Sequence, residues 1–225
     1  MTLTIHKAET PNFRTGRRGD FAPDQIVIHV TEGDAEGTLS WFGSAKSQVS
    51  AHYHVRKDGR IDQFVDENDE AYHAGRVDNP TAPLVLERPG INPNWYSIGI
   101  EHEGLGQDDL TDEQRKSSIA LIRDICTRQN IPMDRTHIVR HHEIYSLKNC
   151  PGGIDVDRLV QQIAGAGHPG SPDITPPQFV WSGFFGDYLI VTKRVSDTEW
   201  YFVKLHDLTN PTRARTPLSQ MPTTK

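Results

Sequence analysis

The stretch IVIHVTEG, residues 26–33, decides the fold of this chain of 225 residues. It opens with a run of β-branched residues that stops at His29, which is typical of a buried strand that ends in an imidazole. A second stretch of the same kind, HIVRHHEIYSLKNCPGG at residues 137–153, passes through His141 and reaches Cys150 one loop later. Two neutral imidazoles and one thiolate are a sufficient ligand set for a catalytic zinc ion with one position left open for water. Together the two stretches predict a metal-dependent hydrolase.

The segments between and around these stretches carry further strand and helix patterns. Gly99 in SIGIE suggests a close backbone approach at that point of the strand, and the Pro- and Asn-rich residues 76–95 are expected to form an irregular loop. Alternation, capping residues and apolar spacing predict the following elements: strand 26–29, helix 38–44, hairpin 50–65 around Asp58-Gly59, strand 97–101, helix 111–129 opened by a Thr111–Gln114 capping box, strand 137–141, and a helix ending near residue 164. This order predicts an α/β fold with a mixed central β-sheet flanked by helices.

The composition changes after residue 164. Residues 165–177, GAGHPGSPDITPP, have the composition of a linker. Beyond them, DYLIVTK at 187–193 and EWYFVKL at 199–205 predict a hairpin. We therefore expect a catalytic domain at 1–164, a linker at 165–177, and a small β-rich module at 178–225 that either docks on the first domain or stands alone.

Charge and composition narrow the classes of partner. The net charge of −6 makes no case for nucleic acid as a partner, which would require a basic face, and no segment has the unbroken apolar length of a membrane helix. The N-terminus lacks the pattern of a secretory signal. We therefore expect the protein to be made in a cytoplasm and not to be exported by that route. Two cysteines are too few for a disulfide framework, and Cys126 lies in a helical pattern that favours a core position. A monomer is the favoured state.

Five pieces of the chain resemble, in the same order, the zinc-dependent N-acetylmuramoyl-L-alanine amidases. That family includes phage lysozymes of the amidase type, bacterial cell-wall recycling amidases and peptidoglycan recognition proteins. The pieces lie between residues 24 and 164: IVIHVTEG, SAHYHVRKDGRIDQFV, AYHAGR, YSIGIEHEG and IVRHHEIYSLKNCPGG. The resemblance implies Zn²⁺ as the cofactor and peptidoglycan or a muropeptide as the substrate. The bond cut would be the amide between N-acetylmuramic acid and L-alanine.

The resemblance also implies which residues bind the metal. His29 matches the first zinc ligand and Cys150 the third. His141 matches the second ligand because it ends the strand IVRH, although the loop that follows then needs one inserted residue. His142 is the alternative, since it has the family's commoner spacing to Cys150.

The same resemblance assigns catalytic and substrate contacts. Glu101 matches the carboxylate that one branch of the family uses to move the proton, while Ala51 stands where another branch has a tyrosine. Lys148 matches a lysine near the metal and is expected to stabilise the oxyanion. Three further residues are expected to contact sugar or peptide: His73, Trp41 and Trp95.

Several alternatives stay open at this level. The protein could be a phage endolysin, with residues 178–225 binding the cell wall, or a cytosolic amidase that trims recycled muropeptides. A different class would be a peptidoglycan-binding protein without turnover, although Cys150 argues against it. A third would be a zinc peptidase that acts on the stem peptide through His52 and His54.

Overall fold

A computed structural model describes residues 3–165 in full, together with the backbone of 179–182, 187–194, 200–204 and 212–214. The chain divides into two compact units, Met1–Ala164 and Gly165–Lys225, which are described separately. None of the helices in these described parts combines the length and the apolar character that crossing a membrane requires.

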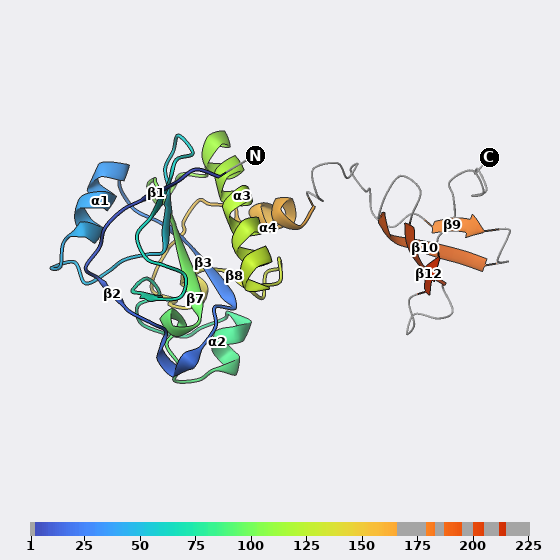
Figure 1. Cartoon of the computed structure of the whole chain (residues 1–225), viewed down its shortest axis with the longest axis horizontal. Helices are drawn as coiled ribbons and strands as arrows, with labels where there is room; N and C mark the ends of the chain where they lie inside the picture. The colour runs from blue at the N-terminus through green and yellow to red at the C-terminus, as the bar shows by residue number, and fades with distance from the viewer. Residues whose placement is uncertain (1–2, 166–178, 183–186, 195–199, 205–211, 215–225) are drawn as a thin grey trace. The chain divides into compact units, whose positions relative to one another are not determined.

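A six-stranded mixed sheet forms the centre of the first unit, in the order β1-β5-β4-β7-β3-β8 (Figure 1). The β4–β5 pair is antiparallel, and the other four pairs are parallel. The strands of this sheet are β1 (Ile5–Lys7), β3 (Gln25–Val30), β4 (Tyr53–Val55), β5 (Ile61–Gln63), β7 (Ser97–His102) and β8 (Ile138–Arg140). A separate antiparallel pair joins β2 (Phe13–Arg14) to β6 (Glu70–Ala71). The α/β class with a mixed sheet is thus confirmed.

Helices cover both faces of this sheet (Figure 1). They are α1 (Ala35–Gly43), α2 (Pro83–Glu87), α3 (Asp112–Gln129) and α4 (Val156–Gly165). Ile28 of β3 shares a buried apolar cluster with Leu121 of α3 and Leu159 of α4. Its neighbour Val27 clusters instead with Val85 of α2. Because successive residues of a strand point to opposite faces, His29 lies on the face of Val27, away from α3 and α4.

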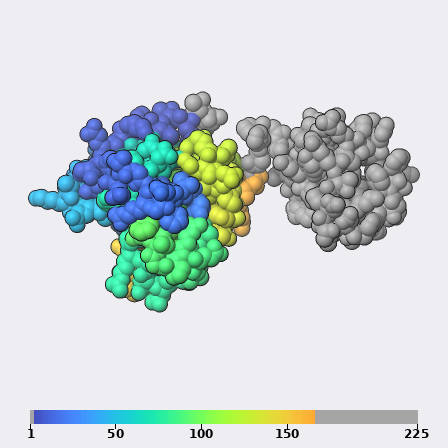
Figure 2. All heavy atoms as spheres, turned by 60° about the horizontal axis from the view of Figure 1, so that its bottom comes forward, coloured from blue at the N-terminus to red at the C-terminus, as the bar shows by residue number. Residues whose placement is uncertain are grey.

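The local elements follow the sequence patterns closely where those patterns are strong. The 50–65 hairpin and the capping box at the start of α3 are both present. The prediction of an irregular loop over 76–95 was wrong in part, because the segment contains α2 and a 3-10 turn, Pro93–Trp95. In the space-filling view the segment that carries α2 lies at the surface of the unit (Figure 2). Strands β1, β2 and β6, of two or three residues each, had no periodic signal.

The second unit is a four-stranded antiparallel sheet in the order β12-β11-β10-β9. Its strands are β9 (Phe179–Ser182), β10 (Asp187–Arg194), β11 (Trp200–Lys204) and β12 (Thr212–Ala214). The antiparallel pairing of β10 with β11 matches the predicted hairpin. The turn between them, 195–199, and the predicted linker from 166 onward lie outside the described residues.

Candidate active site

Three neighbouring parallel strands bring chemically active side chains to one edge of the sheet. Strands β3, β7 and β8 run in the same direction, so their carboxyl ends meet. His29 and Glu101 are the next-to-last residues of β3 and β7 and are paired in register. His141 directly follows β8, and the loop after it returns with Cys150. The parallel arrangement therefore joins residues that are far apart in the sequence.

His29, His141 and Cys150 form a compact group whose ligand atoms all lie within 4.8 Å of one another. Nδ1 of His29 is 3.1 Å from Nδ1 of His141 and 3.7 Å from Sγ of Cys150. Within residues 3–165 this is the one group of three or more His, Cys, Asp or Glu side chains with the geometry to hold a metal ion. His142, the alternative to His141, is not part of the group; its backbone N–H donates to the carbonyl of Cys150 over 2.9 Å.

The protonation states of these three side chains favour the binding of a cation. Burial, reinforced by the neighbouring His141, holds the pKa of His29 well below its ordinary value. Burial likewise lowers the pKa of His141 to about 4. Both rings are therefore neutral near pH 7 and offer lone pairs. Burial, followed by the charge of Glu101, raises the pKa of the Cys150 thiol, so the thiolate needs a bound cation to persist. The backbone N–H of Val30 donates to its sulfur over 3.4 Å.

Glu101 lines the same pocket as His29, His141 and Cys150, and its pKa is altered. Burial, followed by the charge of Glu32, raises its pKa to about 8, and Lys148 acts in the opposite direction. Its Oε2 atom is buried and has no hydrogen-bond partner among the described residues. A carboxyl group that titrates near neutrality can both accept and release a proton at working pH.

The group opens into a pocket of about 560 Å³. His29, Glu101, His141, Lys148 and Cys150 contribute to its wall. Trp41 of α1 also lines it, with 57% of its surface exposed. The pocket therefore combines candidate ligands, a proton carrier, a cation and an aromatic ring.

Two other expected substrate contacts have different surroundings. His73 lines the pocket but is buried. Its Nδ1 lies 3.2 Å from Nε2 of His29 and its Nε2 lies 3.3 Å from Oγ of Ser97. Trp95 does not line this pocket and packs against Phe21, with ring centroids 6.4 Å apart. Contact of either residue with substrate stays a prediction.

Glu32 is a pocket residue that the sequence reasoning did not single out. It lies directly after the first strand, within IVIHVTEG, and adopts a left-handed backbone conformation with φ of 56°. Its carboxylate accepts a hydrogen bond from the N–H of Gly106 over 3.0 Å. A non-glycine residue at positive φ beside a candidate site was not visible from residue types, because the strain belongs to the backbone.

His52 and His54 are occupied elsewhere. Nδ1 of His52 accepts a hydrogen bond from the N–H of Gly99 over 3.0 Å, and Nδ1 of His54 is 3.2 Å from Oδ2 of Asp62. Neither belongs to the metal-binding group found in the described part of the chain. The geometry gives no support to a peptidase site built on these two residues.

A cluster of two imidazoles and a thiol at the carboxyl ends of parallel strands, beside a titratable acid and a lysine, defines an α/β protein with a candidate metallohydrolase site. The chain belongs to the N-acetylmuramoyl-L-alanine amidase family, whose model matches residues 19–153. The resemblance drawn from the five motifs is thereby confirmed.

Individual relatives agree with this assignment. The chain is 34% identical over 127 residues to N-acetylmuramoyl-L-alanine amidase A of Achromobacter lyticus, a match that covers 55% of this chain and 61% of that protein. Across the curated relatives it matches, the chain spans 59–61% of their length. A crystal structure of a selenomethionine derivative of AmpD has a TM-score of 0.59 at 25% identity and covers 72% of this chain and 99% of its own. A complex of AmiD from E. coli with anhydro-N-acetylmuramic acid-L-Ala-D-gamma-Glu-L-Lys has a TM-score of 0.53 at 25% identity, covering 71% and 77%.

Proposed function

We propose that this protein is a zinc-dependent hydrolase of the amide bond between N-acetylmuramic acid and L-alanine in peptidoglycan or its fragments. The observation that carries the proposal is the group of His29, His141 and Cys150, with ligand atoms within 4.8 Å of one another at the wall of an open pocket. Membership of the amidase family and the muropeptide bound by the similar AmiD support the substrate class.

The donor set fits Zn²⁺ in particular. Imidazole nitrogen and thiolate sulfur are the ligands that zinc prefers, and three protein ligands leave one position free, as in catalytic zinc sites. A zinc ion held here would polarise the amide carbonyl and lower the pKa of water, which supplies hydroxide near neutral pH. His29 and His141 offer neutral nitrogens, and Cys150 would lose its proton on binding.

Glu101 and Lys148 supply the remaining chemistry. Hydrolysis joins the oxygen of water to the carbonyl carbon, breaks the bond from that carbon to nitrogen, and delivers a proton to the departing amine. Glu101 takes the proton from the attacking water and passes it to that nitrogen, a role that contributes about 10² to 10⁴-fold to the rate. Lys148 stabilises the negative charge that develops on the carbonyl oxygen; loss of one such donor costs about 10² to 10³-fold.

Trp41 forms a partly exposed apolar side of the pocket for the glycan or the stem peptide.

Two cellular settings fit this function. In a phage endolysin the second unit would hold the enzyme on the cell wall, and in a recycling amidase the substrate would be a soluble muropeptide. In both settings the enzyme would cut the same bond with the same residues. A soluble muropeptide is therefore the appropriate first substrate.

The test is mass spectrometry of a defined muropeptide after incubation with the zinc-loaded protein and with Cys150→Ser. A released glycan bearing the free lactyl carboxylate, together with an intact stem peptide, is expected from the parent and not from the variant. A cut within the stem peptide would point to a peptidase. Binding without any new product would mean a recognition protein, and either result would overturn the proposal.

A further inference from the structure

Both candidate ligand histidines turn their second nitrogen toward one short segment, His73–Ala74. Nε2 of His141 lies 3.1 Å from the carbonyl oxygen of Ala74. A carbonyl oxygen only accepts, so Nε2 of His141 carries the hydrogen and its Nδ1 is bare. That bare Nδ1 is the atom that faces Nδ1 of His29.

For His29 the partner is another imidazole, which can either donate or accept. Nε2 of His29 lies 3.2 Å from Nδ1 of His73, and Nε2 of His73 lies 3.3 Å from Oγ of Ser97. The direction of the hydrogen bond between His29 and His73 follows from the next hydrogen-bond partner, Ser97. The Ser97 hydroxyl donates its single hydrogen to the carbonyl of Pro93 over 2.7 Å, so its oxygen must accept from His73.

The remaining hydrogens follow from this. A neutral imidazole carries one N–H, and His73 uses its own at Nε2, which leaves its Nδ1 as an acceptor. Nε2 of His29 then donates to His73, and Nδ1 of His29 is bare. This is the nitrogen that faces Cys150 and His141. A ring with its hydrogen on Nδ1 instead would have no lone pair to offer at the metal position.

We propose that His73, oriented by Ser97, is a positioning residue that fixes the tautomer of His29, so that both ligand histidines present Nδ1 to the metal. The chain of donors runs from His29 through His73 and Ser97 to the carbonyl of Pro93. This rests on the proposed function only for the identity of the ion. It assigns to His73 a role distinct from substrate contact, since both of its ring nitrogens are already engaged.

The surrounding backbone is shaped to hold His73 in this place. A Cβ atom at Gly99 would lie 2.4 Å from Cγ of His73, so only glycine leaves room for the ring. The backbone N–H groups of His73 and Ala74 both donate to Oδ1 of Asn94, over 3.2 and 2.8 Å. The same fixed segment therefore supplies the acceptor for each ligand histidine.

The test measures zinc affinity by competition with a chromophoric chelator, without any use of turnover. His73→Leu removes the acceptor and should weaken zinc binding by about 10 to 100-fold, as losses of hydrogen-bond partners behind a ligand do. His73→Asn should restore most of the affinity, because its Oδ1 can stand in for Nδ1. Ser97→Ala should show a smaller loss of the same sign.

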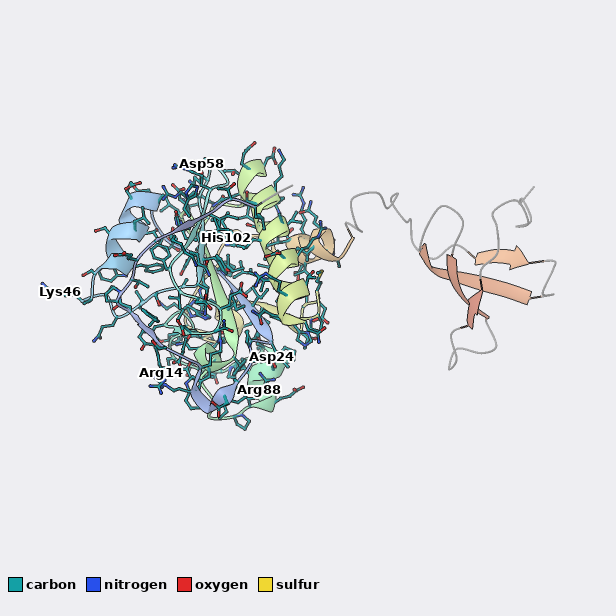
Figure 3. The ribbon with its side chains drawn as sticks, in the orientation of Figure 1. Arg14, Asp24, Lys46, Asp58, Arg88 and His102 are labelled. Carbon is teal, nitrogen blue, oxygen red and sulfur yellow. The ribbon has the colours of Figure 1, made fainter. Side chains whose placement is uncertain are left out.

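Ser118→Ala is a matched control. Ser118 is as fully buried as Ser97, and its Oγ lies 2.8 Å from Nε2 of His102. His102 lies in the interior beside α3 (Figure 3) and reaches only the backbone carbonyl of His29, over 3.0 Å. Ser118→Ala therefore removes an equivalent hydrogen bond without touching the His29 ring, and its zinc affinity should equal that of the parent.

A second readout is the ¹⁵N NMR shift pattern of His29 in the zinc-free protein. Hydrogen on Nε2 is expected in the parent, and a mixture of tautomers in Ser97→Ala. Two results would overturn this inference without bearing on the proposed amidase function. One is hydrogen on Nδ1 of His29 in the parent. The other is equal zinc affinity for the parent, His73→Leu and Ser97→Ala. Conversely, a parent that binds zinc as expected but cleaves no muropeptide would sink the proposed function alone.

Discussion

At the scale of single residues, a variant of Glu101 tests the proposed catalytic step separately from metal binding. Its carboxyl lies beside the candidate ligands without belonging to their group, and burial followed by Glu32 raises its pKa to about 8. Glu101→Gln keeps the shape of the side chain but cannot carry a proton. We expect its kcat/KM on a muropeptide to fall by about 10² to 10⁴-fold with unchanged zinc content, measured by steady-state kinetics and metal analysis.

Glu103→Gln is the matched control for that variant. Glu103 has the same chemistry two residues further along, but its carboxylate accepts a hydrogen bond from the N–H of Lys57 and does not line the pocket. Its activity should stay within a few-fold of the parent. Full turnover by Glu101→Gln would remove Glu101 from the mechanism.

Asp62 is a buried acid whose effect on stability depends on pH. Burial alone would raise its pKa, but hydrogen bonds from His54 and Arg56 outweigh it and hold the pKa at about 2. A folded-state pKa below the unfolded value stabilises the fold above pH 4 and ceases to do so as the pH falls toward 2. Asp62→Asn should therefore lower the free energy of unfolding by about 2 kcal/mol at pH 7.

That difference should shrink steadily between pH 4 and pH 2, as followed by urea unfolding of parent and variant side by side. Asp66→Asn, which makes the same change at an exposed position of the same segment, serves as the control. A gap of constant size from pH 7 to pH 2 would mean that packing, and not the charge of Asp62, carries the effect.

At the scale of elements, the sequence was most informative where side-chain pattern and backbone requirement coincide. Strands β3 and β7 carry β-branched residues toward a buried sheet. A close backbone approach was expected at Gly99, and a Cβ atom there would meet the side-chain ring of His73. The order of the strands in the sheet depends on long-range pairing and had no local signal. The same holds for β1, which pairs with β5 across more than fifty residues.

The residues of the candidate site likewise divide into those that the sequence indicated and those that it could not place. Residue types indicated His29 and Cys150, because each lies at the end of a strand or in a loop where packing does not require it, whereas Glu101 was indicated by the resemblance to the amidase family. The choice between His141 and His142 could not be made from spacing, since one residue in a loop costs little. The positions of Glu32 and Trp95 depend on backbone conformation and tertiary packing, which no motif encodes.

The start of α3 offers a prediction at this scale. Thr111 accepts a hydrogen bond from the N–H of Gln114 and donates one to the carbonyl of Lys57, in the turn of the β4–β5 hairpin. Thr111→Ala removes both bonds and should cost about 1 to 2 kcal/mol of unfolding free energy in urea denaturation. Thr111→Ser keeps the hydroxyl and should cost much less; equal losses would show that the methyl group matters more than the cap.

At the scale of the whole first unit, the candidate metal site joins parts of the chain that only folding brings together. His29 is separated from His141 by 112 positions and from Cys150 by 121. The unfolded chain cannot hold these three side chains around one ion. Zinc should therefore bind the folded state almost exclusively, and its binding free energy adds to stability.

At free zinc about 1,000-fold above Kd this linkage contributes about 4 kcal/mol, which should raise Tm by roughly 10 °C for a unit of this size. Thermal unfolding with zinc and with a chelator measures the difference. Cys150→Ser should abolish most of the zinc-induced rise. Cys126→Ser, which alters the buried core cysteine of α3, should lower Tm but keep the full rise. An equal zinc-induced rise in Cys150→Ser and the parent would place the ion elsewhere, because only Cys150 has its sulfur 3.7 Å from the ring of His29.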